Sequence, residues 1–423
     1  MRADLLAAVR AALPRGGAGH ESCAWRVPGR IEVLGKHTDY AGGRSLVCAV
    51  EQGFVVAAVP RADAVVRVIN VADGSEVSLA LDPGLPPPSD AWMRYPATVV
   101  RRLARNFPGA RRGADLAFLS DLPLASGMSS SSAFMVAVFL AVADVNRLSE
   151  TPAYTQAIST PEDLAGYLAT VENGQSFGAL TGDRGVGTFG GSEDHTAMLC
   201  CRAGELSQYS FCPVRHERQV SLPAGYRFVV AVSGVKAEKT GAARNAYNRA
   251  SLAVRAILDA WRAASGRQDP SLADAVSRAG TAAVREVVEH TGIDGFSTAT
   301  LLARFDQFVE ESTHIVLSAG DALARGDVTA FGELVDRSQR LAEGLLGNQV
   351  AETVALARSA RDLGAGAASA FGAGFGGSVW ALVEEADAAP FADRWEASYR
   401  AAFPSVAPAF LVTSPGPAAA KLS

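Results

Sequence analysis

The segment Pro123-Leu-Ala-Ser-Gly-Met-Ser-Ser-Ser-Ser-Ala133 combines a turn of small residues with four consecutive hydroxyl side chains. It follows a predicted strand, Asp115–Leu119, and opens a predicted helix, Ala133–Val145, which is apolar and rich in alanine. Backbone N–H groups at such a turn bind anions because they are unpaired, and the dipole of the following helix adds to the attraction. The segment therefore predicts a phosphate-binding loop. A serine-rich helix cap is the alternative interpretation.

Two other glycine-rich segments, 185–190 and 372–377, fit the dinucleotide pattern GxGxxG. Neither lies between a strand and a helix, as that pattern requires. The second segment also fits a protein-kinase glycine loop, which needs a lysine on a following strand. The chain contains only the lysines Lys36, Lys236, Lys239 and Lys421, and Lys421 alone follows that loop. A Walker loop is also absent, so these three nucleotide-binding classes are excluded.

Length and composition set broader bounds. A chain of 423 residues with 48% hydrophobic residues is expected to form about two domains with a sizeable core. The net charge of −5 gives no reason to expect nucleic acid or an anionic membrane as partner. The five cysteines lack CxxC spacing, which favours a reducing compartment. We therefore expect a cytoplasmic protein without a membrane-spanning segment.

The order of predicted elements is mixed. Strands are expected at Tyr226–Val232 and Ser378–Val383, and helical periodicity dominates from Gly241 to Leu363. Residues 174–193 are rich in glycine and are expected to form a long loop, which in a compact domain is usually functional or disordered. This order predicts an α+β fold with two lobes. We place the N-terminal lobe, with the phosphate loop 123–133, at 1–214 and the C-terminal lobe at 215–423.

Three segments together resemble the GHMP family of small-molecule kinases and, within it, the galactokinases. Pro28-Gly-Arg-Ile-Glu-Val-Leu-Gly-Lys-His-Thr-Asp-Tyr-Ala-Gly-Gly43 is similar to the galactokinase signature PGRxNxIGEHxDYxGG. Pro123–Ser132 resembles the family phosphate loop PxGxGLSSSA, and 372–377 resembles its GxGFGG turn. The resemblance implies the two-lobed GHMP kinase fold, with a mixed sheet in the N-terminal lobe and an α/β C-terminal lobe.

The resemblance also implies an activity, the transfer of the ATP γ-phosphoryl group to the anomeric hydroxyl of a small sugar, most plausibly galactose, with Mg²⁺. Catalysis of this kind is mostly positioning and charge neutralisation. The implied catalytic residues are Asp194 and Arg30, and the implied metal ligands are Ser131 and Glu172. The implied ATP-binding residues are Pro123, Ala125, Ser126, Gly127, Met128, Ser129, Ser130, Ser131, Ser132 and Trp92. The implied sugar-binding residues are Lys36, His37, Asp39, Gly191, Tyr247, Gly374 and Gly376.

Departures from the signature bear on the choice of sugar. Glu32 stands where the signature has Asn, and Lys36 stands where it has Glu. An ammonium only donates hydrogen bonds, so Lys36 could pair with the carboxylate of a uronic acid. Alternatively, Glu32 and Lys36 form an ion pair that leaves the pocket neutral. Both interpretations stay open at this point.

A second departure is the long glycine-rich stretch before Asp194, which could be a lid or a specificity loop. Alternative functions are a kinase for galacturonate or arabinose and, in another class, a non-catalytic sensor that binds sugar and ATP. We expect a monomer or a weak homo-oligomer.

Overall fold

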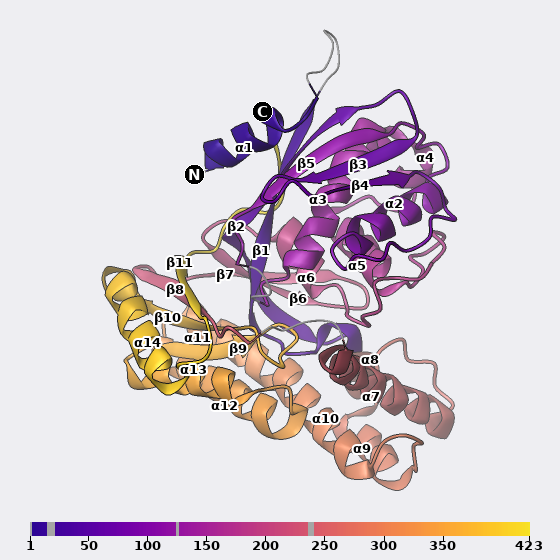
Figure 1. Cartoon of the computed structure of the whole chain (residues 1–423). Helices are drawn as coiled ribbons and strands as arrows, with labels where there is room; N and C mark the ends of the chain where they lie inside the picture. The colour runs from indigo at the N-terminus through magenta and orange to yellow at the C-terminus, as the bar shows by residue number, and fades with distance from the viewer. Residues whose placement is uncertain (1, 15–21, 124–126, 236–240) are drawn as a thin grey trace.

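The computed structural model describes residues 2–14, 22–123, 127–235 and 241–423. Two sheets form the centres of two lobes (Figure 1). The first sheet has the strand order β12-β1-β2-β5-β3-β4, and the hairpin β6–β7 is joined to β2 through β6. All its pairings are antiparallel except β3 with β5. The strands are β1 (Cys23–Leu34), β2 (Arg44–Pro60), β3 (Val65–Asn70), β4 (Glu76–Ala80), β5 (Ala114–Ser120), β6 (Glu205–Ser210), β7 (Arg215–Ser221) and β12 (Ala420–Leu422).

Helices cover both faces of this sheet. Alternate strand residues point to opposite sides, so each face has apolar side chains to bury. Val56 and Ala58 of β2 belong to the core under the helices α2–α5, whereas Val55 and Ala57 lie in a smaller cluster under α1. The helix α3 is buried along nearly its whole length against β1 and β2, as its apolar sequence predicts. The N-lobe helices are α1 (Arg2–Ala11), α2 (Arg94–Asn106), α3 (Ser130–Val145), α4 (Pro152–Thr155), α5 (Pro161–Asn173) and α6 (Glu193–Cys200).

The second sheet is antiparallel, with the order β11-β8-β10-β9. Its strands are β8 (Tyr226–Val232), β9 (Ala367–Phe371), β10 (Ser378–Glu384) and β11 (Ala409–Thr413). The helices of this lobe are α7 (Gly241–Ser265), α8 (Leu272–Ala279), α9 (Thr281–His290), α10 (Thr298–Glu310), α11 (Val316–Ala324), α12 (Val328–Leu341), α13 (Ala351–Asp362) and α14 (Ala388–Ala402). One-turn π-helices, η3 (Glu311–Ile315) and η4 (Ala342–Leu346), follow α10 and α12.

One hydrophobic core runs through both lobes. Val230 of β8, Phe331 of α12 and Trp380 of β10 belong to the same cluster of buried residues as Ile31 and Val33 of β1. A separate cluster joins α7, α8, α9 and α10. The site-bearing ends of β1 and α3 therefore rest on a continuous packed interior.

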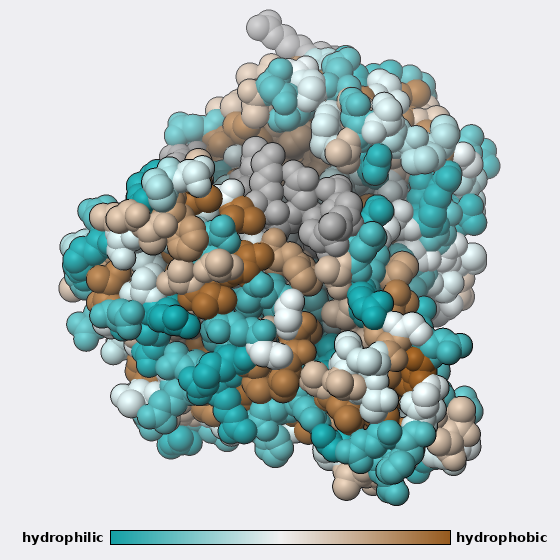
Figure 2. All heavy atoms as spheres, turned by 60° about the horizontal axis from the view of Figure 1, so that its bottom comes forward, coloured by the Kyte–Doolittle hydropathy of each residue, from teal (hydrophilic) through white to brown (hydrophobic). Residues whose placement is uncertain are grey.

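The predicted two-lobed α+β architecture is observed. The sheets change between Ser221 and Tyr226, a few residues after the predicted boundary at 214/215, which itself remains a prediction. Short strands such as β3 and β4 were not expected from the sequence. Within the described residues, no helix combines the length and the apolar character needed to cross a bilayer. On the face shown in Figure 2, hydrophilic side chains spread over the surface and smaller hydrophobic areas lie between them.

Candidate active site

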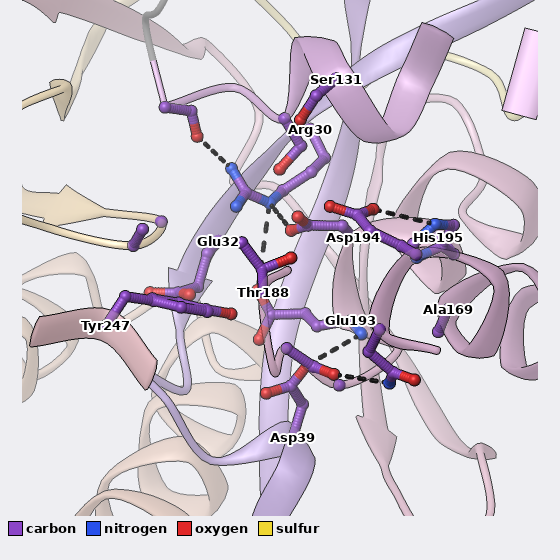
Figure 3. A pocket seen from close by; sticks show the side chains of 18 of the residues that line it. Arg30, Glu32, Asp39, Ser131, Ala169, Thr188, Glu193, Asp194, His195 and Tyr247 are labelled. Carbon is purple, nitrogen blue, oxygen red and sulfur yellow. Dashed lines mark hydrogen bonds and ion pairs between the residues drawn. The ribbon is translucent and has the colours of Figure 1, made fainter. Parts of the chain in front are cut away.

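Both lobes contribute residues to a pocket of about 510 Å³ (Figure 3). Its walls come from β1, the loop after β1, the start of α3, the end of α5, the start of α6, α7 and the turn after β9. A pocket of this size can hold a small molecule and its reaction partner.

Arg30 and Asp194 lie side by side in the pocket (Figure 3). Arg30 Nε donates to Asp194 Oδ1 at 2.7 Å, and an Arg30 terminal nitrogen donates to the carbonyl of Gly127 at 2.6 Å. The guanidinium also lies 5.7 Å from the ring centre of Phe371. Arg30 is 3% exposed, and its acidic neighbours raise its pKa. A charge-assisted bond of this kind fixes both the position and the ionised form of the carboxylate.

The N-terminus of α3 faces the pocket. Gly127, Ser129, Ser130 and Ser131 line it, and the N-cap residue Ser129 makes no side-chain cap hydrogen bond. Ser130 Oγ is buried and has no hydrogen-bond partner among the described residues. The first N–H groups of a helix, together with an unpartnered hydroxyl, suit the oxygens of a phosphate chain. Ala125 and Ser126, also predicted to bind ATP, lie outside the described residues.

Glu172 lies at the end of α5 and lines the pocket beside His195. Ser132 Oγ donates to Glu172 Oε2 at 2.8 Å and lies 3.5 Å from Asp194 Oδ2. His195 Nε2 is 3.4 Å from Glu172 Oε2. The serine in contact with Glu172 is thus Ser132, the residue after the predicted metal ligand Ser131. Within the part of the chain that the structure describes, no group of three His, Cys, Asp or Glu side chains could hold a metal ion.

Asp39 accepts hydrogen bonds from the backbone N–H of Tyr40 at 2.8 Å and from that of Glu193 at 3.1 Å. The second bond satisfies a free donor at the N-terminus of α6, the helix that carries Asp194. Gly191 makes this approach possible, since a Cβ there would lie 2.5 Å from Asp39 Oδ2. Burial raises the pKa of Asp39, which the two amide hydrogen bonds oppose. Asp39 therefore joins the signature loop to α6 and also lines the pocket.

His37 and Tyr247 complete one wall, with ring centres 5.2 Å apart. His37 has a positive φ of 59°, and its ring nitrogens contact Tyr40 Oη at 2.8 Å and the carbonyl of Ala373 at 3.1 Å. Arg304 also donates to Tyr40 Oη, at 3.2 Å. The imidazole is thereby held between the two lobes.

Two buried carboxyl groups, Glu32 and Glu193, stand below Arg30 (Figure 3). Burial raises the pKa of Glu32 to about 7, against the lowering effect of Arg30 and Lys36. Burial and the Glu32 charge raise the pKa of Glu193 well above its ordinary value. Arg30 Nε lies 4.0 Å from Glu193 Oε1, so the guanidinium is shared between Asp194 and this pair.

Lys36 does not line the pocket. Its side chain is buried, and Nζ donates to Ser338 Oγ of α12 at 2.9 Å. Ser338 Oγ in turn donates to Glu311 Oε1 at 2.9 Å, which also accepts from the N–H of Gly35 at 2.8 Å. Among the described residues no ion pair joins Lys36 to Glu32, so the ion-pair interpretation does not describe its surroundings, and the contact of Lys36 with a sugar carboxylate stays a prediction.

The glycine-rich stretch before Asp194 has two parts. Residues 175–185 pack on α2, where Arg101 binds Asp183 at 2.5 Å and Arg102 donates to the carbonyl of Gln175 at 2.7 Å. Residues 186–192 reach the pocket, which Thr188 lines together with Gly190 and Gly191. The predicted long loop is present, and its second part forms a wall of the pocket.

Several predicted residues lie away from the pocket walls. The Trp92 ring packs on Phe118 and Phe134, with ring centres 6.0 and 6.3 Å apart, and Tyr95 lines the pocket instead. Met128 is part of the hydrophobic core, and Pro123 is not among the lining residues.

Two predicted glycines also serve packing. A Cβ on Gly374 would meet the Asn348 carbonyl at 2.3 Å, and one on Gly376 would meet the Val235 carbonyl at 2.7 Å. Gly372 and Ala373 are the lining residues of this turn.

Sequence reasoning did not select Glu193 or Thr188, both of which line the pocket. It named Ser132 only as an ATP-binding residue and Glu32 only as a departure from the signature that could pair with Lys36. The signal for Glu32 is its spacing from Arg30, because residues two apart on a strand point to the same side. Glu193 precedes Asp194 at the start of a helix, where an acidic side chain usually only favours the helix dipole.

Comparisons with known proteins define the class first. The family model of the GHMP kinases N terminal domain matches residues 94–183, and the model GHMP kinases C terminal matches residues 321–401. A third model, the galactokinase galactose-binding signature, matches residues 17–60. The chain thus carries the two domain models of the GHMP kinases.

The relatives narrow the class. A galactokinase from Chloroflexus aggregans is 31% identical over 85% of this chain and 83% of its own length, and one from Roseiflexus sp. is 28% identical over 88% and 86%. The chain belongs to the galactokinase family. The crystal structure of Lactococcus lactis galactokinase complexed with galactose has the same fold, with a TM-score of 0.76, 23% identity and 95% of each chain covered. Methanococcus jannaschii mevalonate kinase has a TM-score of 0.59 at 12% identity, covering 95% of this chain and 99% of its own. The predicted family, fold and sugar kinase class are confirmed.

Proposed function

We propose that this protein transfers the γ-phosphoryl group of ATP to the anomeric (C1) hydroxyl of a hexose, with galactose as the first candidate. The observation that carries the proposal is the 2.7 Å ion pair between Arg30 and Asp194 in the pocket that the N-terminus of α3 also lines. The relatives named galactokinase and the matched galactose-binding signature support galactose as the acceptor.

The chemistry assigns one role to each member of the pair. The Asp194 carboxylate accepts, or orients, the proton of the sugar hydroxyl, whose oxygen forms a bond to the γ-phosphorus. The bond from that phosphorus to the β,γ-bridging oxygen breaks, and ADP leaves. Arg30 keeps Asp194 ionised and places positive charge beside the transferring group. The α3 N-terminus and its serines bind the phosphate chain.

The donor set at Glu172 fits Mg²⁺. Glu172 supplies a carboxylate and the α3 serines supply hydroxyls, all hard oxygen ligands, and Mg²⁺ in such sites takes one or two carboxylates and completes its shell with phosphates and water. When bound, the ion neutralises phosphate charge. Glu172 and the predicted ligand Ser131 would hold the ion, and Ser132, which donates to Glu172 Oε2, would orient that carboxylate.

The proposal includes a cytoplasmic location, which the five free cysteines support. A monomer or a weak homo-oligomer remains the expected state.

The test is ADP formation with ATP, Mg²⁺ and a panel of sugars that includes galactose, arabinose and galacturonate. Asp194→Ala should still bind ATP but lose roughly 10²–10⁴ of turnover, the usual contribution of such a group. Asp259→Asn, which changes an exposed carboxylate, is the control. Wild-type turnover in Asp194→Ala would show that Asp194 has no part in the mechanism. Binding of sugar and ATP without ADP from any sugar would indicate a sensor.

A further inference from the structure

The pocket is strongly acidic. Its lining among the described residues includes the five carboxyl groups Glu32, Asp39, Glu172, Glu193 and Asp194, against one guanidinium, Arg30. A sugar entering this pocket therefore meets carboxylate oxygens on several sides. Carboxylates accept hydrogen bonds but do not donate them when ionised, so the pocket suits a ligand rich in O–H or N–H donors.

Most of these carboxyl groups are bound by protein donors. Asp39 accepts from two backbone N–H groups, and Asp194 accepts from Arg30. Glu172 accepts from Ser132, and Glu193 accepts from Ser45.

Glu32 differs. Its side chain lines the pocket and is 5% exposed, and its carboxyl group has a side-chain hydrogen bond with Glu193, yet Oε1 has no hydrogen-bond partner in the part of the chain that the structure describes. A buried acceptor without a donor costs free energy. A hydrogen-bond donor on the ligand should therefore contribute most to binding at this oxygen.

The nearest ammonium along the chain does not fill this role. Lys36 lies beyond the turn at Gly35 and donates to Ser338 on the C-terminal lobe. Glu32 is therefore the departure from the galactokinase signature that changes the pocket wall, and it changes it towards negative charge.

We propose that Glu32 is a specificity-determining residue that binds an N–H or O–H donor of the sugar, and that the pocket accepts an amino sugar and rejects a sugar acid. This inference rests on the proposed sugar kinase function. An ammonium both donates to the carboxylate and compensates its charge, whereas the carboxylate of a uronate adds a like charge to the cluster.

The size of the effect follows from the kind of bond. A hydrogen bond to a charged group contributes about 1.5–3 kcal/mol and a neutral one about 0.5–1.5 kcal/mol. Glu32→Gln keeps the shape and a carbonyl acceptor but removes the charge. It should therefore lower kcat/KM for an amino sugar about tenfold relative to a neutral sugar.

The experiment compares galactose, its 2-amino-2-deoxy analogue and galacturonate as acceptors at pH 8, above the raised pKa of Glu32 of about 7, and at one salt concentration. In wild type we expect kcat/KM to be highest for the first two and lowest for galacturonate. In Glu32→Gln the amino-sugar to galactose ratio should fall about tenfold and the galacturonate to galactose ratio should rise. Glu385→Gln, which neutralises an exposed carboxylate beside Arg227, is the matched control and should leave both ratios unchanged.

A second variant distinguishes an effect on sugar recognition from a loss of folding. Glu32→Asn introduces the residue of the signature and should shift both ratios in the same direction. Ratios that stay within about twofold in both variants, with galactose still phosphorylated, would overturn the role of Glu32 and leave the sugar kinase proposal intact.

Failure of the proposed function looks different, because no sugar then yields ADP. In that case, calorimetric binding of the same three sugars decides the inference. Tighter binding of the amino sugar than of galacturonate in wild type, lost in Glu32→Gln, would support it. Equal binding of the two would refute it.

Discussion

Glu32 makes the stability of this protein depend on pH in a direction opposite to that of most surface carboxylates. Its pKa is raised from 4.5 to about 7 by burial in the folded protein, where Arg30, Lys36, Glu193 and Glu311 are the charged groups around it. Below the unfolded value both states carry the proton, so the full stability is present. As the pH rises, the unfolded chain releases its proton first, and the folded state loses stability until it too ionises near pH 7.

The magnitude follows from the two pKa values. Each pKa unit corresponds to 1.36 kcal/mol, so the loss above neutral pH is about 3 kcal/mol, most of it between pH 5 and pH 8. Glu32→Gln has no carboxyl proton to release at this position, so its unfolding free energy should not fall in this way as the pH rises. The difference in unfolding free energy between Glu32→Gln and wild type should therefore grow by about 2–3 kcal/mol in favour of the variant from pH 5 to pH 8.

The assay is urea unfolding of both proteins at pH 5, 6, 7 and 8 and constant ionic strength. Glu385→Gln, at an exposed site, should show a constant difference from wild type. A Glu32→Gln advantage that changes by less than about 1 kcal/mol over this range would show that Glu32 is not held protonated in the folded protein. The raised pKa of Glu32 in the folded protein would then be wrong.

Three further outcomes are expected. Ser132→Ala removes the donor to Glu172 and should raise the Mg²⁺ concentration for half-maximal rate about tenfold, measured by Mg²⁺ titration of ADP formation. Gly191→Ala places a Cβ 2.5 Å from Asp39 Oδ2 and should raise the KM for sugar about tenfold or more, measured by initial rates. Lys36→Met breaks the bond to Ser338 and should lower the unfolding free energy by about 3 kcal/mol without changing the order of sugar preference, measured by urea unfolding and the sugar panel.

The Gly191→Ala prediction has a matched control, and each of the other two has a result that would contradict it. Gly292→Ala adds a Cβ where no atom lies within 4 Å and should leave KM unchanged. An unaltered Mg²⁺ dependence in Ser132→Ala would contradict the orienting role of that hydroxyl. A reversal of sugar preference in Lys36→Met would show that Lys36 contributes to sugar recognition in the pocket.

Local sequence signals were sufficient for much of the site. A strand, a serine-rich turn and an apolar helix predict the phosphate loop, and the structure places Ser129, Ser130 and Ser131 at the pocket. The signature segment gives Arg30 and Asp39 only through its resemblance to the galactokinases, because an aspartate in such a tight turn is otherwise an ordinary turn residue.

The position of Lys36 could not be predicted, because it depends on a register shift in β1 between Glu32 and Leu34 and on the backbone conformation of Gly35. Arg30, Glu32 and Lys36 are spaced two and four residues apart, which on a continuous strand would place them on one face. The strand β1 ends at Leu34, and Gly35 has a φ of 112°, so the alternation stops before Lys36. A Cβ at Gly35 would lie within 2.6 Å of Ser45, so glycine is required there.

Ser131 and Ser132 illustrate a second limit. Neighbouring residues of a helix point about 100° apart, so the serine that faces Glu172 depends on where the helix begins. The helix begins at Ser130, and this register directs the Ser132 hydroxyl to Glu172. A run of four serines contains no signal that separates the two positions.

The core shared by the lobes has a consequence for how substrates enter. Buried residues of β1 belong to one cluster with Phe331 and Trp380 of the C-terminal lobe, so pulling the lobes apart would expose packed apolar surface to water. Hinge opening of the whole molecule is therefore energetically disfavoured. Motion at the pocket is then expected in short segments that have little buried surface, such as 186–192, where Gly190 lies beside Tyr247. The turnover rate of this kinase should then follow the motion of a loop, and viscosity or loop mutations should affect it more than changes at the interface between the lobes.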